Sequence, residues 1–286
     1  MRLLVESLGA SSDPRVRDTV ATAKVRAALA YTHGMDDDSA AAMLTGLPMD
    51  ELPLTQGVFA RIVALGQAVD RKTWAECDAL SEQLVQLEPK LLPNERDRLE
   101  GMSLGTRGRA KMHQRLLGEA LPLLQAAVHH HEQHTPREVG RSRLYLVMAL
   151  RMQGELRAAL GQLEAAQREI DHCERRLSPA YGAQTQVFLY YEMTRTLVAG
   201  GQYAAAVATG ERALGLARGT GSWWPLLGIL RTVAWAYRGA ERRADAERVV
   251  EELSTWAGRS TPLAAGLAAA LQQEASGPVI EDGEVY

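Results

Sequence analysis

The side chains best suited to chemistry in this sequence are the histidines His129, His130, His131 and His134 of the segment VHHHEQH. On a helix, His130 and His134 stand four residues apart and share one face, so their imidazoles could bind one soft divalent cation. A third ligand is missing nearby, because Glu132 would point to another side of the helix. We therefore expect a polar helix end whose partly protonated imidazoles favour the helix dipole, with no metal and no cofactor.

Two other charged groups have an equally plain interpretation. Asp36–Asp38 lack the alternating oxygen ligands of a calcium loop and suit a solvated helix start. The densest basic stretch lacks the interleaved aromatic residues that nucleic-acid binding would favour, and the chain has a net charge of −3 and a pI near 6.2. We therefore expect neither nucleic acid nor a membrane surface as a partner. The basic stretch contains Arg96, Arg98, Arg107, Arg109, Lys111 and Arg115.

Motifs for the common catalytic mechanisms are missing from the sequence. It has no Gly-rich phosphate loop, no Gly-x-Ser-x-Gly elbow, no His-Glu-x-x-His and no paired-cysteine motif. Cys77 and Cys173 offer neither a disulfide framework nor a zinc knuckle, and we expect Cys77 to be a small buried hydrophobe. The sequence therefore predicts a chain that is not an enzyme.

The elements that must position these residues are helices, since no convincing strand pattern occurs and most breaks carry Gly or Pro. No apolar run reaches the ~20 residues of a membrane span, and the first residues have too short an apolar core for a secretory signal. We therefore expect a cytoplasmic protein, and the preference for Arg over Lys suggests a bacterial one. Helices are predicted over residues 14–33, 35–46, 57–70, 73–87, 94–112, 114–133, 136–152, 156–177, 180–199, 203–218, 223–238, 242–257 and 262–275.

A repeated pattern of small and large apolar residues is clearest in the segment RLYLVMALRMQGELRAALGQLEAA, residues 143–166. Gly154 suits a turn with positive φ, Ala159 allows two helix backbones to approach closely, and Leu163 fills the seam between hairpins. The same phase recurs along the chain, which distinguishes a repeat array from a single helical hairpin. Positions equivalent to Ala159 lie 43, 39, 47 and 40 residues apart and are Cys77, Ala120, Ala159, Ala206 and Ala246.

This phase resembles the tetratricopeptide repeat (TPR), although the intervals exceed the roughly 34 residues of a standard TPR. The chain is most similar to degenerate, long-period members, such as the superhelical regions of MalT-like bacterial regulators, over about residues 56–256. The resemblance implies an all-α fold, a right-handed superhelix (α-solenoid) of antiparallel helix hairpins. We expect an N-terminal helical segment or cap over residues 1–55, the repeat domain over 56–275 and a flexible acidic tail over 276–286.

The resemblance further implies that the first helix of each hairpin lines a concave groove for a peptide. Arg offers planar, bidentate donors for carboxylates, while Met and aromatic side chains adapt to apolar anchors, so an acidic and partly apolar peptide would fit. The alternative is that the Met and aromatic residues form the core between helices. Carrying the family's groove positions onto this chain selects Met102, Arg109, Met112, Arg141, Met148, Arg151, Phe188, Tyr191, Arg195, Arg231, Trp235 and Arg238.

Two functions are compatible with such a groove. The first is a protein-interaction module, an adaptor or regulatory subunit, whose groove could also accept the chain's own C-terminal tail. The second is a bacterial TPR-type signal receptor or sensor whose superhelix changes shape on binding a peptide or small ligand. Docking of the chaperone type is disfavoured, because that family motif needs Lys and Asn where this chain has Gly105 and Arg109, Leu144 and Met148, and Tyr191 and Arg195.

Overall fold

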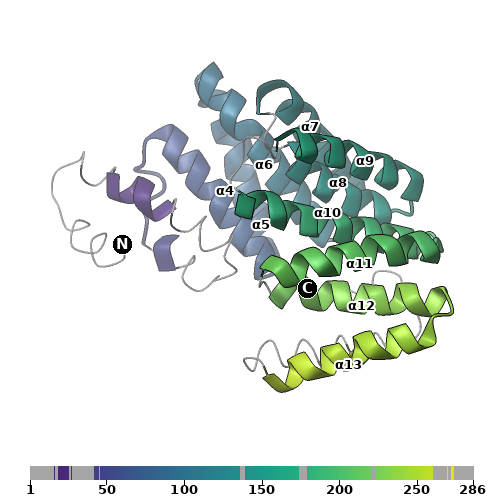
Figure 1. The fold of residues 1–286 in the computed structure, drawn as a ribbon. Helices are drawn as coiled ribbons and strands as arrows, with labels where there is room; N and C mark the ends of the chain where they lie inside the picture. Colours follow the sequence, from purple (N-terminus) through teal and green to yellow (C-terminus); the bar gives the residue numbers. More distant parts are fainter. Residues whose placement is uncertain are drawn as a thin grey trace. The chain divides into compact units, whose positions relative to one another are not determined.

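The computed structural model describes residues 46–135, 139–173, 179–220 and 223–259, together with residues 16, 19–25, 27, 42–44, 269 and 272–273. Helices account for most of these residues, and none of them lies in a strand. The fold class predicted from the sequence is thereby confirmed, since the described chain is all-α and its consecutive helices pack as antiparallel hairpins (Figure 1).

The helix bounds agree with the predicted ranges to within a few residues. The predicted segments over 14–33, 35–46 and 262–275 lie largely outside the described residues, as do Asp36–Asp38 and the whole tail. The helices are α4 (Leu54–Asp70), α5 (Trp74–Leu87), the short 3-10 helix η1 (Glu88–Lys90), α6 (Pro93–His113), α7 (Leu117–His134), α8 (Val139–Met152), α9 (Leu156–Cys173), α10 (Pro179–Ala199), α11 (Tyr203–Thr220), α12 (Trp223–Gly239) and α13 (Arg243–Arg259).

Five hairpins share one turn, which repeats between α4 and α5, α6 and α7, α8 and α9, α10 and α11, and α12 and α13. In each turn one residue has a left-handed backbone, with φ between 57° and 85°. The next residue donates its N–H to the carbonyl five positions earlier, at 2.8–2.9 Å, which closes the helix end as a Schellman motif. The left-handed residues are Lys72, Arg115, Gly154, Gly201 and Glu241.

The repeat register read from the sequence is confirmed by these turns. Each predicted small-contact position, such as Ala159, lies five residues after the left-handed residue of its hairpin and is buried. Cys77 occupies this position in α5, and burial raises the pKa of its thiol to about 11. A thiol that stays protonated and buried is the small hydrophobe predicted from the sequence.

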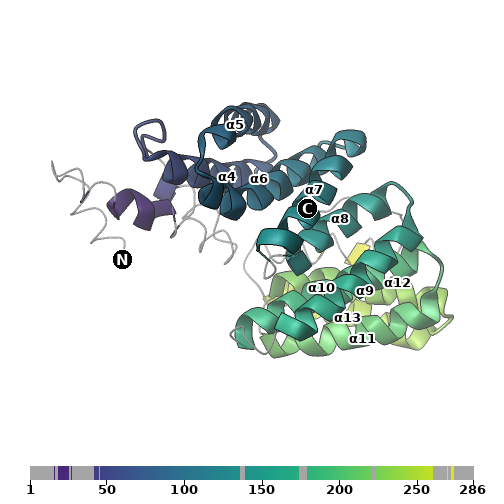
Figure 2. The same cartoon turned by 90° about the horizontal axis from the view of Figure 1, so that it is seen from above.

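The chain divides into two compact units, residues 1–136 and 137–286. In the first unit α4 and α6 lie side by side (Figure 2), and the core includes Val58, Leu65 and Leu84 together with Val25 and Met43 from the N-terminal segment. This division falls inside the predicted repeat domain, and the predicted boundaries at residues 55 and 276 stay predictions.

Close packing in the first unit depends on glycines of α6 that face α7. A Cβ added at Gly108 would lie 2.7 Å from Cγ of Leu124, and one added at Gly101 would lie 2.6 Å from the His131 ring. Since neither position has room for a methyl group, α6 and α7 approach each other more closely than helices with larger residues could.

The second unit builds its core from α10 to α13, which lie one after another (Figure 1). Leu227, Ile229, Leu230 and Leu253 are among its fully buried side chains. This core contains aromatic as well as aliphatic side chains. Through it the first helices of neighbouring hairpins pack against one another.

Candidate functional site

The first helices of the second unit form one layer, because α10 packs against both α8 and α12. This is the arrangement in which side chains from three successive hairpins can meet. We define the first-helix face as the six residues Arg151, Tyr191, Glu192, Arg195, Arg231 and Trp235, which lie on these three helices.

A shared carboxylate lies at the centre of the first-helix face. Arg151 of α8 donates from Nη2 to Oε2 of Glu192 on α10 at 3.0 Å, and Arg195 donates from Nη1 to Oε1 of the same carboxylate at 3.1 Å. The side chains of Arg151 and Glu192 are only 4% and 6% exposed. Burial of this kind removes water screening, so the interaction between these charges is strong.

Aromatic rings flank these charges on two helices. The guanidinium of Arg195 lies 5.5 Å from the centroid of the Tyr191 ring, and that of Arg231 lies 4.9 Å from the Trp235 ring. Both are cation–π contacts, which hold the planar guanidinium groups against an apolar surface. Tyr191 also reaches α12, since a Cβ added at Gly228 would lie 2.6 Å from its hydroxyl oxygen.

The first-helix face therefore contains three guanidinium groups, one carboxylate and two aromatic rings. Five of these six residues are buried and Arg195 keeps 13% of its side chain exposed, so a ligand carboxylate could reach the guanidinium donors only by displacing Glu192. Glu192 was not among the residues selected from the sequence. The signal that points to it is a single charge within the apolar run VFLYYEM, residues 187–193, because a lone charge on a buried face needs a partner.

The remaining predicted groove residues are distributed between the two units. Met148 and Phe188 are half-buried and Arg238 is exposed, all in the second unit. Arg141 belongs to α8, and its side chain lies outside the described part of the chain.

In the first unit the selected residues have other roles. Met102 packs against the core, and Arg109 forms an ion pair with Asp70. Met112 is fully buried, and Arg151, Tyr191, Arg231 and Trp235 of the first-helix face are also buried, so its place in a groove stays a prediction. The alternative left open by the sequence, that some of these residues are core, holds for Met112.

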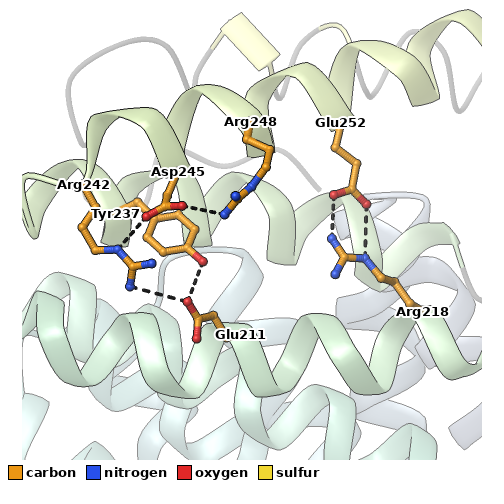
Figure 3. A network of polar contacts seen from close by, with 7 residues as sticks. All are labelled: Glu211, Arg218, Tyr237, Arg242, Asp245, Arg248 and Glu252. Atoms are coloured by element: carbon orange, nitrogen blue, oxygen red, sulfur yellow. Dashed lines mark hydrogen bonds and ion pairs between the residues drawn. The ribbon is translucent and has the colours of Figure 1, made fainter.

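A second polar network, shown in Figure 3, joins α11, α12 and α13. Tyr237 donates to Glu211 at 2.7 Å, Arg242 contacts both Glu211 and Asp245, and Arg218 pairs with Glu252 at 2.6 Å. Burial and the Glu211 hydrogen bond raise the pKa of the Tyr237 hydroxyl to about 12.

Charges in this second network balance, since its three arginines face three carboxylates. Most of these groups are well exposed, so the network holds α13 in place and has little charge left for a ligand. The first-helix face, which combines guanidinium groups with aromatic rings, is the better candidate site.

Among the residues that the structure describes, no helix combines the length and the apolar character that crossing a bilayer requires.

Comparisons with known proteins identify the fold. No family model and no curated protein matches the sequence. A signal-transduction ATPase of the STAND class with a tetratricopeptide repeat sensor, from Pyrococcus horikoshii, matches 91% of this chain with a TM-score of 0.66 and 12% identity. This chain spans 41% of that protein's structure.

Two further solved structures are similar in the same way. RapI in its apo form matches 89% of this chain, over 72% of its own length, with a TM-score of 0.66 and 11% identity. TPR-like repeats of a putative kinesin light chain from Podospora anserina match 78% of this chain, over their whole length, with a TM-score of 0.54 and 19% identity. The chain therefore has the fold of a TPR-like helical repeat protein, as its repeat phase indicated.

Proposed function

We propose that this chain is a non-enzymatic protein-interaction module, an adaptor or regulatory subunit of the bacterial cytoplasm. In this proposal the first-helix face binds an acidic and partly apolar segment of a partner protein. The observation that carries the proposal is the buried carboxylate of Glu192, which is held by Arg151 and Arg195 on two different hairpins.

Glu192 acts in this proposal as a stand-in for a carboxylate of the partner. A ligand carboxylate that enters the first-helix face competes with Glu192 for the same Nη atoms of Arg151 and Arg195. The aromatic rings of Tyr191 and Trp235 then contact an apolar side chain beside the ligand's acidic group, and Met148 and Phe188 extend this apolar surface. Binding of this kind weakens as salt screens the attraction, so its affinity falls with ionic strength.

The C-terminal tail is one segment with the required chemistry. Residues 276–286, SGPVIEDGEVY, combine three carboxylate side chains with Val, Ile and Tyr. The tail lies outside the described residues, and we propose that it competes in cis with the partner for the first-helix face.

The proposal is tested with the tail peptide itself as the probe. A fluorescent peptide of residues 276–286 is titrated into a chain that lacks these residues, and binding is followed by anisotropy. We expect saturable binding, which Arg195→Glu weakens by about tenfold or more because a carboxylate then faces the ligand. Glu192→Gln should strengthen it, since the amide keeps the side-chain shape and removes the competing charge.

The matched control is Arg248→Glu, the same charge reversal on the exposed surface of α13, which should leave the peptide affinity within about twofold. Equal loss in both charge-reversed variants would mean that the attraction is general rather than local. If the full chain binds the peptide as tightly as the shortened chain, competition in cis is wrong.

The second candidate function is a sensor whose superhelix changes shape on binding a peptide or small ligand. It is favoured by the similarity to the STAND protein, whose TPR region is described as a sensor. Solution scattering of the full chain with and without the peptide separates the two functions. A lower radius of gyration with peptide supports the sensor, and an unchanged curve supports the adaptor.

A further inference from the structure

We propose that Asp97, His130 and His134 form a binding site for a divalent transition-metal ion of the Zn²⁺ type on the α6 and α7 hairpin. One ligand atom from each residue lies within 4.8 Å of the others. The third ligand, which the local sequence around the histidines lacks, thus comes from the preceding helix of the same hairpin. The inference is independent of the peptide-binding proposal, because the site lies in the other unit.

The geometry comes from two facing helices. His130 and His134 are one turn apart on α7, with ring centroids 4.7 Å apart, and Nδ1 of His134 lies 3.8 Å from Oδ1 of Asp97 on α6. A tetrahedral ion with bonds of about 2.1 Å holds its ligand atoms about 3.4 Å apart. Rotation of exposed side chains can close the remaining difference without moving either helix.

Glu100 extends the site by one turn along α6. Its Oε2 lies 3.7 Å from Nε2 of His130, so Glu100 pairs with His130 as Asp97 pairs with His134. A carboxylate at the opposite ring nitrogen of a ligating imidazole orients the ring and makes it a better donor, and Glu100 has this place at Nε2 of His130.

One ring nitrogen of His130 could bind a metal ion and has no hydrogen-bond partner in the structure. This atom, Nδ1, is buried. A buried polar atom without a partner is unusual and calls for an explanation, and an ion bound at this Nδ1 would supply one. This observation distinguishes His130 from its exposed neighbour His129, which contacts Gln133.

The donor set selects the class of ion. Two imidazole nitrogens with one carboxylate suit Zn²⁺, Co²⁺ and Ni²⁺, whereas Ca²⁺ and Mg²⁺ prefer oxygen ligands alone. The side chain of Asp97 is 51% exposed, so an ion can enter and water can complete its coordination. An ion bound here joins α6 to α7, and it therefore stabilises that hairpin.

The test uses the untagged, full-length chain after removal of metal with a chelator. Co²⁺ is titrated and followed by its visible absorption, and Zn²⁺ is titrated by calorimetry. We expect one ion per chain, with Asp97→Asn, His130→Ala and His134→Ala each weakening the affinity by about tenfold or more. Zn²⁺ should raise the melting temperature of the wild type, whereas Mg²⁺ and Ca²⁺ should not.

His129→Ala is the matched control, because this side chain is 70% exposed on the same helix and lies outside the site. It should leave the affinity within about twofold of the wild type. Absence of saturable binding by the wild type, or equal loss in His129→Ala and His130→Ala, would overturn the site. Asp97→Asn removes one exposed charge and keeps the side-chain shape, so unchanged binding in that folded variant would also overturn it.

Discussion

The two units of this chain share one hairpin turn, but ion pairs of their basic residues differ in exposure to water. In the first unit, Lys111 pairs with Asp78, whose side chain is 52% exposed, and Arg109 pairs with Asp70 near the surface. In the second unit, Arg151 and Glu192 are almost completely buried. Since water screens the first kind of pair and not the second, the scaffold carries weak exposed pairs in both units, such as Arg218 with Glu252, and a strong buried pair between α8 and α10.

The difference shows how a repeat fold separates architecture from function. Turns and small-contact positions recur in both units and set the hairpin. The residues between them are free to differ. Glycines allow close contacts in both units, at Gly108 in the first and at Gly210 in the second, whereas the pair of Arg151 and Glu192 belongs to the second unit. Four predictions test this contrast, beginning with the largest expected effect.

Removing the buried carboxylate should have the largest effect on stability. Glu192→Ala leaves the guanidinium groups of Arg151 and Arg195 without their shared partner, which we expect to cost about 3–5 kcal/mol. Asp78→Ala, which breaks an exposed pair in the first unit, should cost at most about 1 kcal/mol. Urea unfolding of the full chain measures both. Equal losses would remove the contrast between the two units.

Acid should weaken the first unit through His113 at the end of α6. Burial, followed by the nearby charges of Arg109, Lys72 and Arg115, lowers the pKa of His113 to about 4, against 6.5 for the unperturbed group. As the pH falls, His113 therefore gains a proton in the unfolded chain before it does so in the folded chain. The neutral, buried His113 makes its full contribution to the free energy of unfolding above pH 6.5. This contribution, at most about 3 kcal/mol, is lost as the pH falls from 6.5 to 4.

Hydrogen exchange at pH 7 and pH 5 measures this effect, with faster opening expected in α6 and α7 at the lower pH. His113→Gln cannot gain the proton, so its stability should depend less steeply on pH over the same interval. An equally steep dependence in that variant would show that His113 does not titrate as its surroundings indicate.

Close packing of α6 against α7 should be sensitive to a single methyl group. Gly108→Ala places a Cβ 2.7 Å from Cγ of Leu124 and 3.2 Å from its backbone nitrogen, and we expect a loss of about 1–3 kcal/mol. Gly118→Ala, in the first turn of α7, meets nothing within 4 Å and should be neutral or stabilising by up to about 1 kcal/mol. Thermal melts measure both variants, and equal melting temperatures would contradict close packing of α6 against α7 at Gly108.

The smallest effects should come from the shared turn, where the hairpins differ in the type of the left-handed residue. Gly201→Ala forces a side chain into a backbone with φ of 67° and should destabilise by about 1 kcal/mol. Glu241→Gly, at the equivalent turn where φ is 60°, relieves the same strain and should be neutral or stabilising by less than about 1 kcal/mol. Denaturation midpoints measure both, and a cost for Glu241→Gly would contradict a common turn.

Much of the fold follows from local sequence patterns. Single residues show which features these patterns predict and which they do not. Gly154 and Ala159 predict a turn and a close helix contact, and both are found where the repeat phase places them. Met112, Tyr191 and Arg231 have groove positions by the same phase, and all three are buried. The phase indicates which side of a helix faces inward, but it does not say how deeply a neighbouring helix covers that side.

The helices, the turns and the spacing of the hairpins can be predicted from local sequence, because hydrogen bonds and steric limits within a few residues decide these features. The contacts of Glu192 with Arg151 and of Asp97 with His134 become visible only in the folded chain. Such contacts depend on the rotation and offset of one helix against another, which close packing of many side chains sets together. No spacing along a single helix contains that information.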